Sequence, residues 1–379
     1  MKKVFIISSV LLFVVLIFLG IYNFAFKKES KVVDQSLNNK DVQTTVESKV
    51  KEIKIEKITS VTKEAVIGTV IDKKTQDLKY YNAASGIVWM TDGDGKQERQ
   101  LSQTRVANLT SVFWSPDQNK VLTVTKKEGK EAFYMYDYVI QKGTLLNAGL
   151  DTVVWDNIGT KIFYKYFDKA SSKRSLNIAN PDGSEWQKLA DIEARILKIA
   201  AIPLTSEVSY WNYPNANEET ILQSISVTGG QPKKILTGRY GADYVWSPDG
   251  ANVLVSSLSN KNDKTVMLGI VTFEGKYQDL NVPTIASKCV WSRDGKTIFY
   301  ALPGGIPAGS LMPNDYQENK FNTDDTFWKM DITTGKKERI IETNEIIGKY
   351  DSINLFLSAT QDALYFTNKI DNKLYKISL

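Results

Sequence analysis

The sequence contains no histidine and a single cysteine among its 379 residues. Without histidine, the chain cannot build a Ser–His–Asp or Cys–His catalytic set, a zinc site that needs imidazole, or the usual proton-transfer group near neutral pH. One cysteine excludes an intramolecular disulfide framework. Because Cys289 stands in the apolar run CVW, we interpret it as a buried, inert thiol rather than a nucleophile. We predict no catalytic residues, no metal site and no cofactor.

Blocks of one charge are also missing. The net charge is +5, from 48 basic and 43 acidic residues, and four of those lysines and one glutamate lie in the first 29 residues. The remainder carries 48 − 4 = 44 basic and 43 − 1 = 42 acidic residues, a net charge of +2. No Lys/Arg-rich block with interleaved aromatic residues occurs, so nucleic acid is not a predicted partner.

Long hydrophobic runs are absent except at the N-terminus, where Val4–Phe26 holds 23 residues without a charge. A helix of that length reaches roughly 34 Å, enough to cross the hydrocarbon layer. A cleaved signal peptide is the competing interpretation, but its apolar region is usually shorter and ends in small residues. We therefore expect a transmembrane signal-anchor helix at 4–26, followed by a flexible linker at 27–51.

The orientation of this anchor follows less directly, since lysines flank both of its ends. Only three residues precede the span, so the simplest arrangement leaves the N-terminus in the cytoplasm and exports the rest. The expected protein is a single-pass membrane protein with an extracytoplasmic body, periplasmic or at the cell surface. A cytoplasmic body is the alternative.

The rest of the chain repeats one short phrase. VFWSPDQNKVLTV returns as VVWDNIGTKIFYKYF, YVWSPDGANVLVSS and CVWSRDGKTIFYAL. In each copy an apolar strand is followed by a tight turn of Pro, Asp, Gly or Asn and by a second strand, which is a β-hairpin pattern. We interpret the repeated tryptophans as packing groups and the turn aspartates as turn formers: Trp114, Trp155, Trp246, Trp291, Asp117, Asp249 and Asp294.

The spacing of the phrase predicts the fold. With weaker copies included, the anchor positions are 71, 114, 155, about 202, 246, 291 and 357. A period of 40–45 residues with four short strands per unit is typical of a β-propeller. We predict an all-β fold at 52–379 with seven blades, six or eight being the alternatives. The last unit lacks a fourth strand, and we expect residues 52–58 to supply it and close the ring, which removes exposed sheet edges.

The WSPDG turn with its following strand resembles the TolB-like, WD-repeat-like β-propeller repeats of bacterial envelope proteins and of propellers attached to prolyl oligopeptidases. The resemblance is clearest at Trp114, Trp246 and Trp291 and covers nearly all of 52–379. It implies the propeller fold. The chain departs from WD repeats in having no Gly-His pair. The likeness to prolyl oligopeptidases would imply a hydrolase domain after the propeller, which we do not expect here. TolB itself is soluble and periplasmic and has an extra N-terminal domain. The resemblance therefore implies the fold of this chain but not its cellular role.

One segment breaks the period. The gap of 66 between the last two anchors holds about 23 extra residues, at 303–325, rich in Gly and Pro. Loops of that length are often functional. In a propeller this loop and the loop at 213–220 share the face that carries the links between blades, around the mouth of the central channel. The candidate binding residues on that face are Tyr213, Glu218, Glu219, Asp315, Tyr316, Glu318, Phe321, Asp324 and Asp325. An ordered insertion without a ligand is the alternative.

Two functions remain open. The first is a membrane-tethered, noncatalytic module that binds another envelope protein or a glycan. The second is a carboxylate-based polysaccharide hydrolase or lyase, because two acids alone can cleave a glycosidic bond. The second predicts acidic side chains that face each other across the channel mouth at roughly 5–10 Å. No such pair is evident in the sequence.

Overall fold

The computed structural model describes Glu56–Lys261 and Asp263–Leu379. The chain divides into two units, residues 1–53 and 54–379, and the described residues belong to the second. The predicted span Val4–Phe26, the linker at 27–51 and the first part of the predicted closing strand, 52–55, lie outside the described residues. In the part of the chain that is described, no helix has the length and apolar character needed to cross a membrane.

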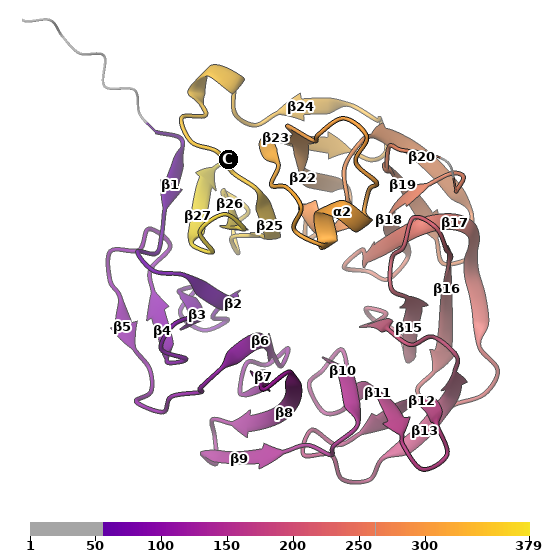
Figure 1. Cartoon of the computed structure of the whole chain (residues 1–379). Coiled ribbons are helices and arrows are strands. Elements are labelled where there is room, and N and C mark those ends of the chain that lie inside the picture. The colour runs from indigo at the N-terminus through magenta and orange to yellow at the C-terminus, as the bar shows by residue number, and fades with distance from the viewer. Residues whose placement is uncertain (1–55, 262) are drawn as a thin grey trace, which may run out of the picture. The chain divides into compact units, whose positions relative to one another are not determined.

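The second unit is built from antiparallel sheets set around a ring, as Figure 1 shows. The first three sheets each have four strands: β2 (Val66–Ile71), β3 (Leu78–Asn82), β4 (Val88–Thr91) and β5 (Arg99–Gln100); β6 (Leu109–Trp114), β7 (Lys120–Lys127), β8 (Lys130–Asp137) and β9 (Lys142–Leu145); β10 (Leu150–Trp155), β11 (Ile162–Asp168), β12 (Lys173–Ala179) and β13 (Gln187–Ile192). Within each sheet the strands pair in chain order, which is the meander of a β-propeller blade.

The remaining sheets continue around the ring. The fourth has seven strands: β14 (Leu197–Ala201), β15 (Glu207–Asn212), β16 (Glu219–Ser226), β17 (Lys233–Trp246), β18 (Asn252–Leu258), β19 (Met267–Thr272) and β20 (Tyr277–Val282). The last two have four: β21 (Cys289–Trp291), β22 (Thr297–Gly304), β23 (Asp324–Asp331) and β24 (Lys337–Arg339); β25 (Ser352–Leu357), β26 (Ala363–Asn368), β27 (Leu374–Ser378) and β1 (Ile58–Ser60). The described helical turns are short: α2 (Asn314–Gln317) and 3₁₀ turns at Ala286–Lys288 and Thr343–Glu345.

The seven-stranded sheet arises from one long strand. Four short strands per unit would leave KKILT and YVW in separate strands, but the structure joins them in the 14-residue β17. Its first part pairs with β16 and its second part with β18, with a register shift between Tyr240 and Asp243. Gly238 and Gly241 both have positive φ in this stretch, where glycine lets the backbone bend without ending the strand.

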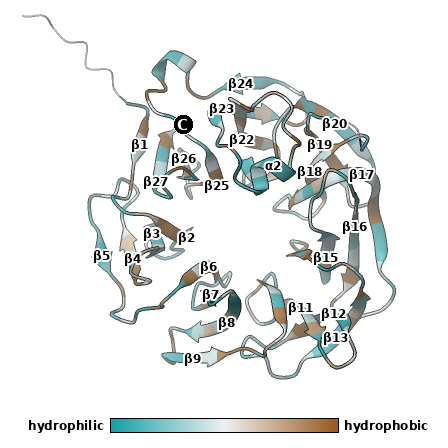
Figure 2. Cartoon of the chain, in the orientation of Figure 1, coloured by the Kyte–Doolittle hydropathy of each residue, from teal (hydrophilic) through white to brown (hydrophobic). Residues whose placement is uncertain are grey.

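The periodic positions mark the ends of the first strands. Ile71, Trp114, Trp155, Trp246, Trp291 and Leu357 close β2, β6, β10, β17, β21 and β25, and Ile202 follows β14 directly. Apolar side chains from neighbouring sheets form the buried clusters between them, whereas outer strands such as β9 and β24 are mostly hydrophilic (Figure 2). The core is therefore a series of interfaces between sheets rather than one central mass.

Each of the four repeated tryptophans makes an equivalent hydrogen bond in addition to its packing contacts. Each indole N–H donates to an oxygen on a strand 37 to 46 residues earlier in the chain. The acceptors are the carbonyls of Gly68, Phe113 and Val245 for Trp114, Trp155 and Trp291, and the Ser209 hydroxyl for Trp246, at 2.7–3.1 Å. A buried indole needs an acceptor, so each tryptophan fixes its own strand against the preceding unit.

The turn after each of three tryptophans has one internal hydrogen-bond pattern. In the turn at 115–120, the Ser115 hydroxyl donates to the Asp117 carboxylate at 2.5 Å and accepts the Lys120 backbone N–H at 2.9 Å. The same contacts recur at 247–252 and 292–297. The three turn aspartates are thus used within their turns, and these hydrogen bonds contribute to lowering the pKa of the carboxyl of Asp249.

The N-terminal strand of the described unit closes the ring. β1 pairs antiparallel with β27, and Ile58 lies opposite Ile377. Glu56 and Lys57, which the sequence places inside the closing strand, precede it, and the strand continues to Ser60. Ile58 is 2% exposed and packs among residues of the last two sheets. The strand thus completes the sheet that contains the C-terminal residues, and the two ends of the unit stabilise each other.

Candidate functional site on the loop face

Two loops far apart in the sequence lie against each other on one face of the ring. The loop at 213–220 joins β15 to β16, and the insertion at 303–325 carries α2 between β22 and β23. Asn314 connects them, because its amide donates to the Asn215 side chain at 3.0 Å and accepts the Ala216 N–H at 2.8 Å. The strand β17 also approaches the insertion closely at Gly241. A Cβ atom added to Gly241 would lie 2.8 Å from Pro313 Cδ. We call this surface the loop face.

The insertion has its own local order. The sequence predicts an irregular loop, but β22 extends to Gly304, β23 begins at Asp324, and α2 forms a single helical turn between them. Asp315 in α2 accepts the Leu311 N–H at 2.7 Å and contacts Lys320 Nζ at 2.7 Å. Lys320, helped by the Leu311 N–H, lowers the pKa of the Asp315 carboxyl. Proline and glycine occur throughout the insertion without preventing a helical turn at its centre.

An apolar cluster anchors α2 to the ring. Met312 and Tyr316 are 5% exposed and pack with Ala216, Leu258 and Ile285, while Phe321 covers the cluster from outside. The rings of Tyr316 and Phe321 lie 6.0 Å apart. Burial of one large side chain contributes roughly 1.5–3 kcal/mol. The insertion is therefore a packed part of the structure rather than an appendage.

Beneath this cluster lies a buried ionic group centred on Lys288. Its ammonium contacts Asp325 and Asp351, each at 2.7 Å, and donates to the Ser352 carbonyl at 3.0 Å. All three charged side chains are 0% exposed. We call Lys288, Asp325 and Asp351 the ionic cluster. It joins the fifth sheet to the sixth, since Asp325 lies in β23 and Asp351 directly precedes β25.

The insertion also bonds to the ionic cluster. The Tyr316 hydroxyl donates to Asp351 at 2.5 Å, and the Thr323 hydroxyl donates to Asp325 at 2.7 Å. Burial acts to raise the pKa of Asp351, but Lys288 and these hydroxyls outweigh it, so the pKa lies below its usual value. For Asp325 burial outweighs the same lysine and raises the pKa. Lys288 thus pairs with two carboxyl groups whose pKa values shift in opposite directions. The insertion supplies the Tyr316 and Thr323 hydroxyls that bond to these carboxyl groups.

A small pocket of about 190 Å³ opens where the loop face meets the first strands of the sheets. Lys198 of β14 and Asp243 of β17 form an ion pair of 2.8 Å at its wall, and Asp243 also accepts the Trp211 indole N–H at 3.1 Å. Lys369 lies 3.7 Å from the centre of the Tyr316 ring, and burial lowers the pKa of this lysine. The pocket therefore combines aromatic faces with both signs of charge.

The predicted binding residues separate into two groups. Exposed at the surface are Tyr213, Glu218, Glu219, Glu318 and Asp324, with Asp315 and Phe321 partly exposed. Tyr316 and Asp325 were predicted to lie on the surface, but both are buried beneath it. The Tyr316 hydroxyl bonds to Asp351 and the Asp325 carboxylate contacts Lys288. Tyr213 and Tyr316 both line the small pocket, while Glu218 bonds within its own loop to Asn215 at 3.1 Å.

The sequence analysis did not identify the residues that hold the site together. Lys198, Asp243, Lys288, Asp351 and Lys369 come from five different places along the chain. A signal was present at Lys288, a lysine directly before the apolar run CVW, where a charge needs a partner if the strand is buried. Its partners are 37 and 63 residues further along the sequence, so a local sequence pattern cannot identify them. Within the described residues, no group of three His, Cys, Asp or Glu side chains is placed to hold a metal ion.

Comparison with known proteins gives the fold. No family model matches the chain, and no curated protein matches it in sequence. Among solved structures, the chain is similar to an oligogalacturonate lyase in complex with manganese, with a TM-score of 0.56, 13% identity, and 85% of this chain and 98% of that chain covered. It is also similar to the β-propeller domain of Cps50 (Swd1) from Myceliophteria thermophila, with a TM-score of 0.54, 11% identity, and coverages of 85% and 99%.

A third similar structure is the β-propeller domain of the Trilobed protease from Pyrococcus furiosus, described as having an open velcro topology. The TM-score is 0.51, the identity 12%, and the coverages 85% of this chain and 94% of that chain. TolB from Acinetobacter baumannii aligns over 69% of this chain with a TM-score of 0.46. At these identities the likeness concerns the fold alone. The described unit is an all-β propeller, similar in architecture to proteins with different activities.

Proposed function

We propose that this chain is a noncatalytic, membrane-tethered propeller that binds another protein of the cell envelope through its loop face. The observation that carries the proposal is the joining of the loop at 213–220 to the insertion at 303–325 through Asn314. The period-breaking insertion and the second loop predicted to share its face thus build one surface. The ionic cluster and the apolar cluster around Tyr316 fix the shape of that surface before any partner arrives.

The chemistry of this surface suits a protein partner. Tyr213 is 39% exposed and lines the adjoining pocket, which has a volume of about 190 Å³, and Glu218 is exposed on the same loop. Pockets for small-molecule ligands usually measure about 300–1,000 Å³, so this one is sized for a single side chain of a partner. An exposed aromatic residue beside such a pocket is the arrangement of a protein-interface hot spot.

A carboxylate-based hydrolase or lyase is supported less well. Asp325 and Asp351 approach each other through Lys288, but both are fully buried and cannot meet a polysaccharide. At the pocket, Asp243 is paired with Lys198 and bonded to Trp211. General acid and base groups need access to the scissile bond. Asp243, Asp325 and Asp351 are each paired with a lysine of the protein instead.

We further propose that the propeller has seven blades, with β17 shared between two of them. The first part of β17 then completes one blade and its second part opens the next. The signal-anchor at 4–26 and the linker at 27–51 would hold this body outside the cytoplasm, as the apolar run and the few residues before it suggest.

The binding proposal is tested with the full-length chain in its native membrane. A photocrosslinking residue replaces the exposed Asn217, and the crosslinked protein is identified by mass spectrometry. The pair of changes Tyr213→Ala and Glu218→Lys should reduce the yield of that product at least fivefold, whereas Trp186→Ala, an exposed aromatic on another hairpin, should leave it unchanged. Equal yields from all three proteins would refute the loop face as the binding surface. Deleting the whole insertion is not a suitable test, because it removes Asp325 of the ionic cluster together with Thr323, which bonds to it.

The location is tested by cysteine labelling. Cys289 is buried, and burial raises the pKa of its thiol, so the natural chain gives little background. A cysteine in place of the exposed Lys169 should react with a membrane-impermeant maleimide in intact spheroplasts. Labelling only after lysis would place the body in the cytoplasm.

A further inference from the structure

A second cavity lies away from the loop-face residues, between the first and second sheets. It has a volume of about 690 Å³, within the range of small-ligand pockets. The cavity follows from a difference in strand length. β7 and β8 have eight residues each, whereas β3 has five, β4 four and β5 two. At about 3.3 Å per residue, the middle strands of the second sheet extend roughly 10 Å beyond those of the first and stay uncovered on that side.

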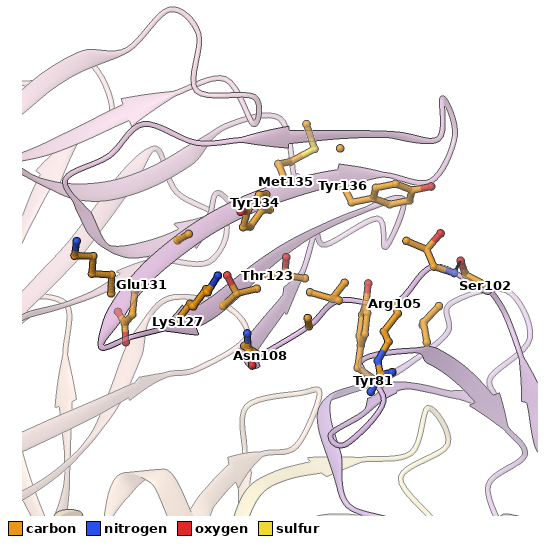
Figure 3. A pocket seen from close by; sticks show the side chains of 18 of the residues that line it. Tyr81, Ser102, Arg105, Asn108, Thr123, Lys127, Glu131, Tyr134, Met135 and Tyr136 are labelled. Atoms are coloured by element: carbon orange, nitrogen blue, oxygen red, sulfur yellow. Dashed lines mark hydrogen bonds between the residues drawn. The ribbon is translucent and has the colours of Figure 1, made fainter.

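The floor of the cavity is one face of the β7–β8 hairpin. Thr123 pairs with Tyr134 and Thr125 with Ala132, and because side chains alternate along a strand, these residues and Tyr136 share a face. Tyr134 is 38% exposed. Residues two apart on a strand lie about 7 Å from each other, so Tyr134 and Tyr136 place two aromatic rings side by side. Figure 3 shows them on one side of the cavity, with Arg105, Asn108 and Tyr81 on the other.

The polar groups of this floor are available to a ligand. Within the described part of the chain, the hydroxyls of Tyr134, Tyr136 and Thr125 make no hydrogen bond to protein. Tyr81, by contrast, already bonds to the Tyr138 hydroxyl at 2.7 Å. The edges of β7 and β8 that face each other are paired along all eight positions, and β9 pairs with β8 at Tyr134–Asp137. A ligand that lies on this face of the hairpin therefore meets aromatic faces and hydroxyls rather than backbone groups.

The charges stand at the rim and are of both signs. Lys127, Lys130 and Arg105 face the cavity with Glu128 and Glu131, and in the described residues none of the five forms a salt bridge. No cluster of one sign exists to select a polyanion. β9 pairs with β8 only at Tyr134–Asp137, so strand addition by a peptide would be confined to the few residues at the start of β8. The mixed charge at the rim and the free hydroxyls on the floor favour a ligand that is uncharged and presents its own hydroxyls.

We propose that this cavity binds a neutral oligosaccharide. The apolar faces of its sugar rings would stack on Tyr134 and Tyr136, and its hydroxyls would bond to the free phenol and threonine hydroxyls. The cavity is lined by different residues from the loop-face pocket, so a glycan here and a protein there are compatible. The inference goes beyond the proposed function and stands without it.

The test uses the full-length chain in detergent and isothermal titration with four neutral hexasaccharides: cellohexaose, xylohexaose, maltohexaose and the hexamer of N-acetylglucosamine. At least one should bind with a dissociation constant below about 1 mM. Tyr134→Ala and Tyr136→Ala should each weaken that binding at least tenfold, while Tyr134→Phe, which keeps the ring, should weaken it less than threefold. Trp186→Ala, which removes an exposed aromatic residue that lines neither cavity, is the matched control and should leave it unchanged.

Several results would overturn the inference. Failure of all four sugars to bind at 5 mM, or binding that survives both alanine changes, excludes a neutral glycan in this cavity. Hexagalacturonate bound in preference to the neutral sugars would show an anion site instead. A random peptide library that yields ligands blocked by Tyr134→Ala, with no sugar bound, would show a peptide site. The loop-face proposal is read out by crosslinking yield and this inference by sugar titration with different variants, so failure of one is distinguishable from failure of the other.

Discussion

Replacing Lys288 by methionine tests the account of the ionic cluster. The change keeps much of the side-chain volume but leaves Asp325 and Asp351 without their cation, although both are fully buried. Removing one partner of a buried ion pair costs about 3–5 kcal/mol, because the remaining charge stays uncompensated. We expect the free energy of unfolding of the Lys288→Met chain to fall by about that amount at pH 7.

The pH dependence gives the sharper result. In the natural protein Lys288 opposes the effect of burial on both carboxyl groups. Without it, burial alone raises both folded-state pKa values above those of the unfolded chain. A raised acid pKa means that the folded state retains protons which the unfolded state has released, so the stability of the variant is lost as the pH rises through those values. The difference from the natural protein should be small near pH 4 and grow to about 3–5 kcal/mol by pH 8.

Urea unfolding followed by tryptophan fluorescence between pH 4 and pH 8 measures this difference. A matched control is Lys336→Met, which removes an exposed pair with Glu338 and should leave the unfolding midpoint unchanged. In the triple variant that also carries Asp325→Asn and Asp351→Asn, the pH dependence should disappear. A Lys288→Met chain within about 1 kcal/mol of the natural protein at pH 7, or a difference independent of pH, would refute the reasoning.

Three further predictions concern the ring. Ile58→Ala should lower the free energy of unfolding by about 2–4 kcal/mol in a urea titration, because Ile58 is 2% exposed between the last two sheets; a loss below about 0.5 kcal/mol would mean that β1 does not close the ring. Trp246→Phe should cost about 1–3 kcal/mol by the same measurement, since it leaves the Ser209 hydroxyl without the indole donor, and an unchanged midpoint would contradict that role. Cys289 should react with a thiol reagent only under unfolding conditions, because burial raises the pKa of its thiol; fast reaction of the native chain would contradict its burial.

Local chemistry in the sequence determined the repeating unit. A large residue that ends an apolar strand, followed by Ser, Pro, Asp and Gly, specifies one hairpin whether or not other units are present, because the turn hydrogen bonds run between residues two to five apart. The period of these hairpins then indicates a propeller, since no unit can bury both faces of its sheet alone. The position of the insertion at 303–325 was evident for the same reason: it interrupts a period.

Which side chains of the insertion are buried and which are exposed was decided only by the tertiary structure. Asp324 and Asp325 are adjacent and identical in the sequence, yet the first is exposed and the second is fully buried against Lys288. The alternation of a β-strand separates them, and its phase was set by the register of β23 on β22. Likewise, Tyr134 and Tyr136 lie in an ordinary strand sequence, and their exposure follows from the shorter strands of the neighbouring sheet. Neighbouring residues determine the turns, whereas buried charge pairs and clefts depend on contacts between residues that are dozens of positions apart in the sequence.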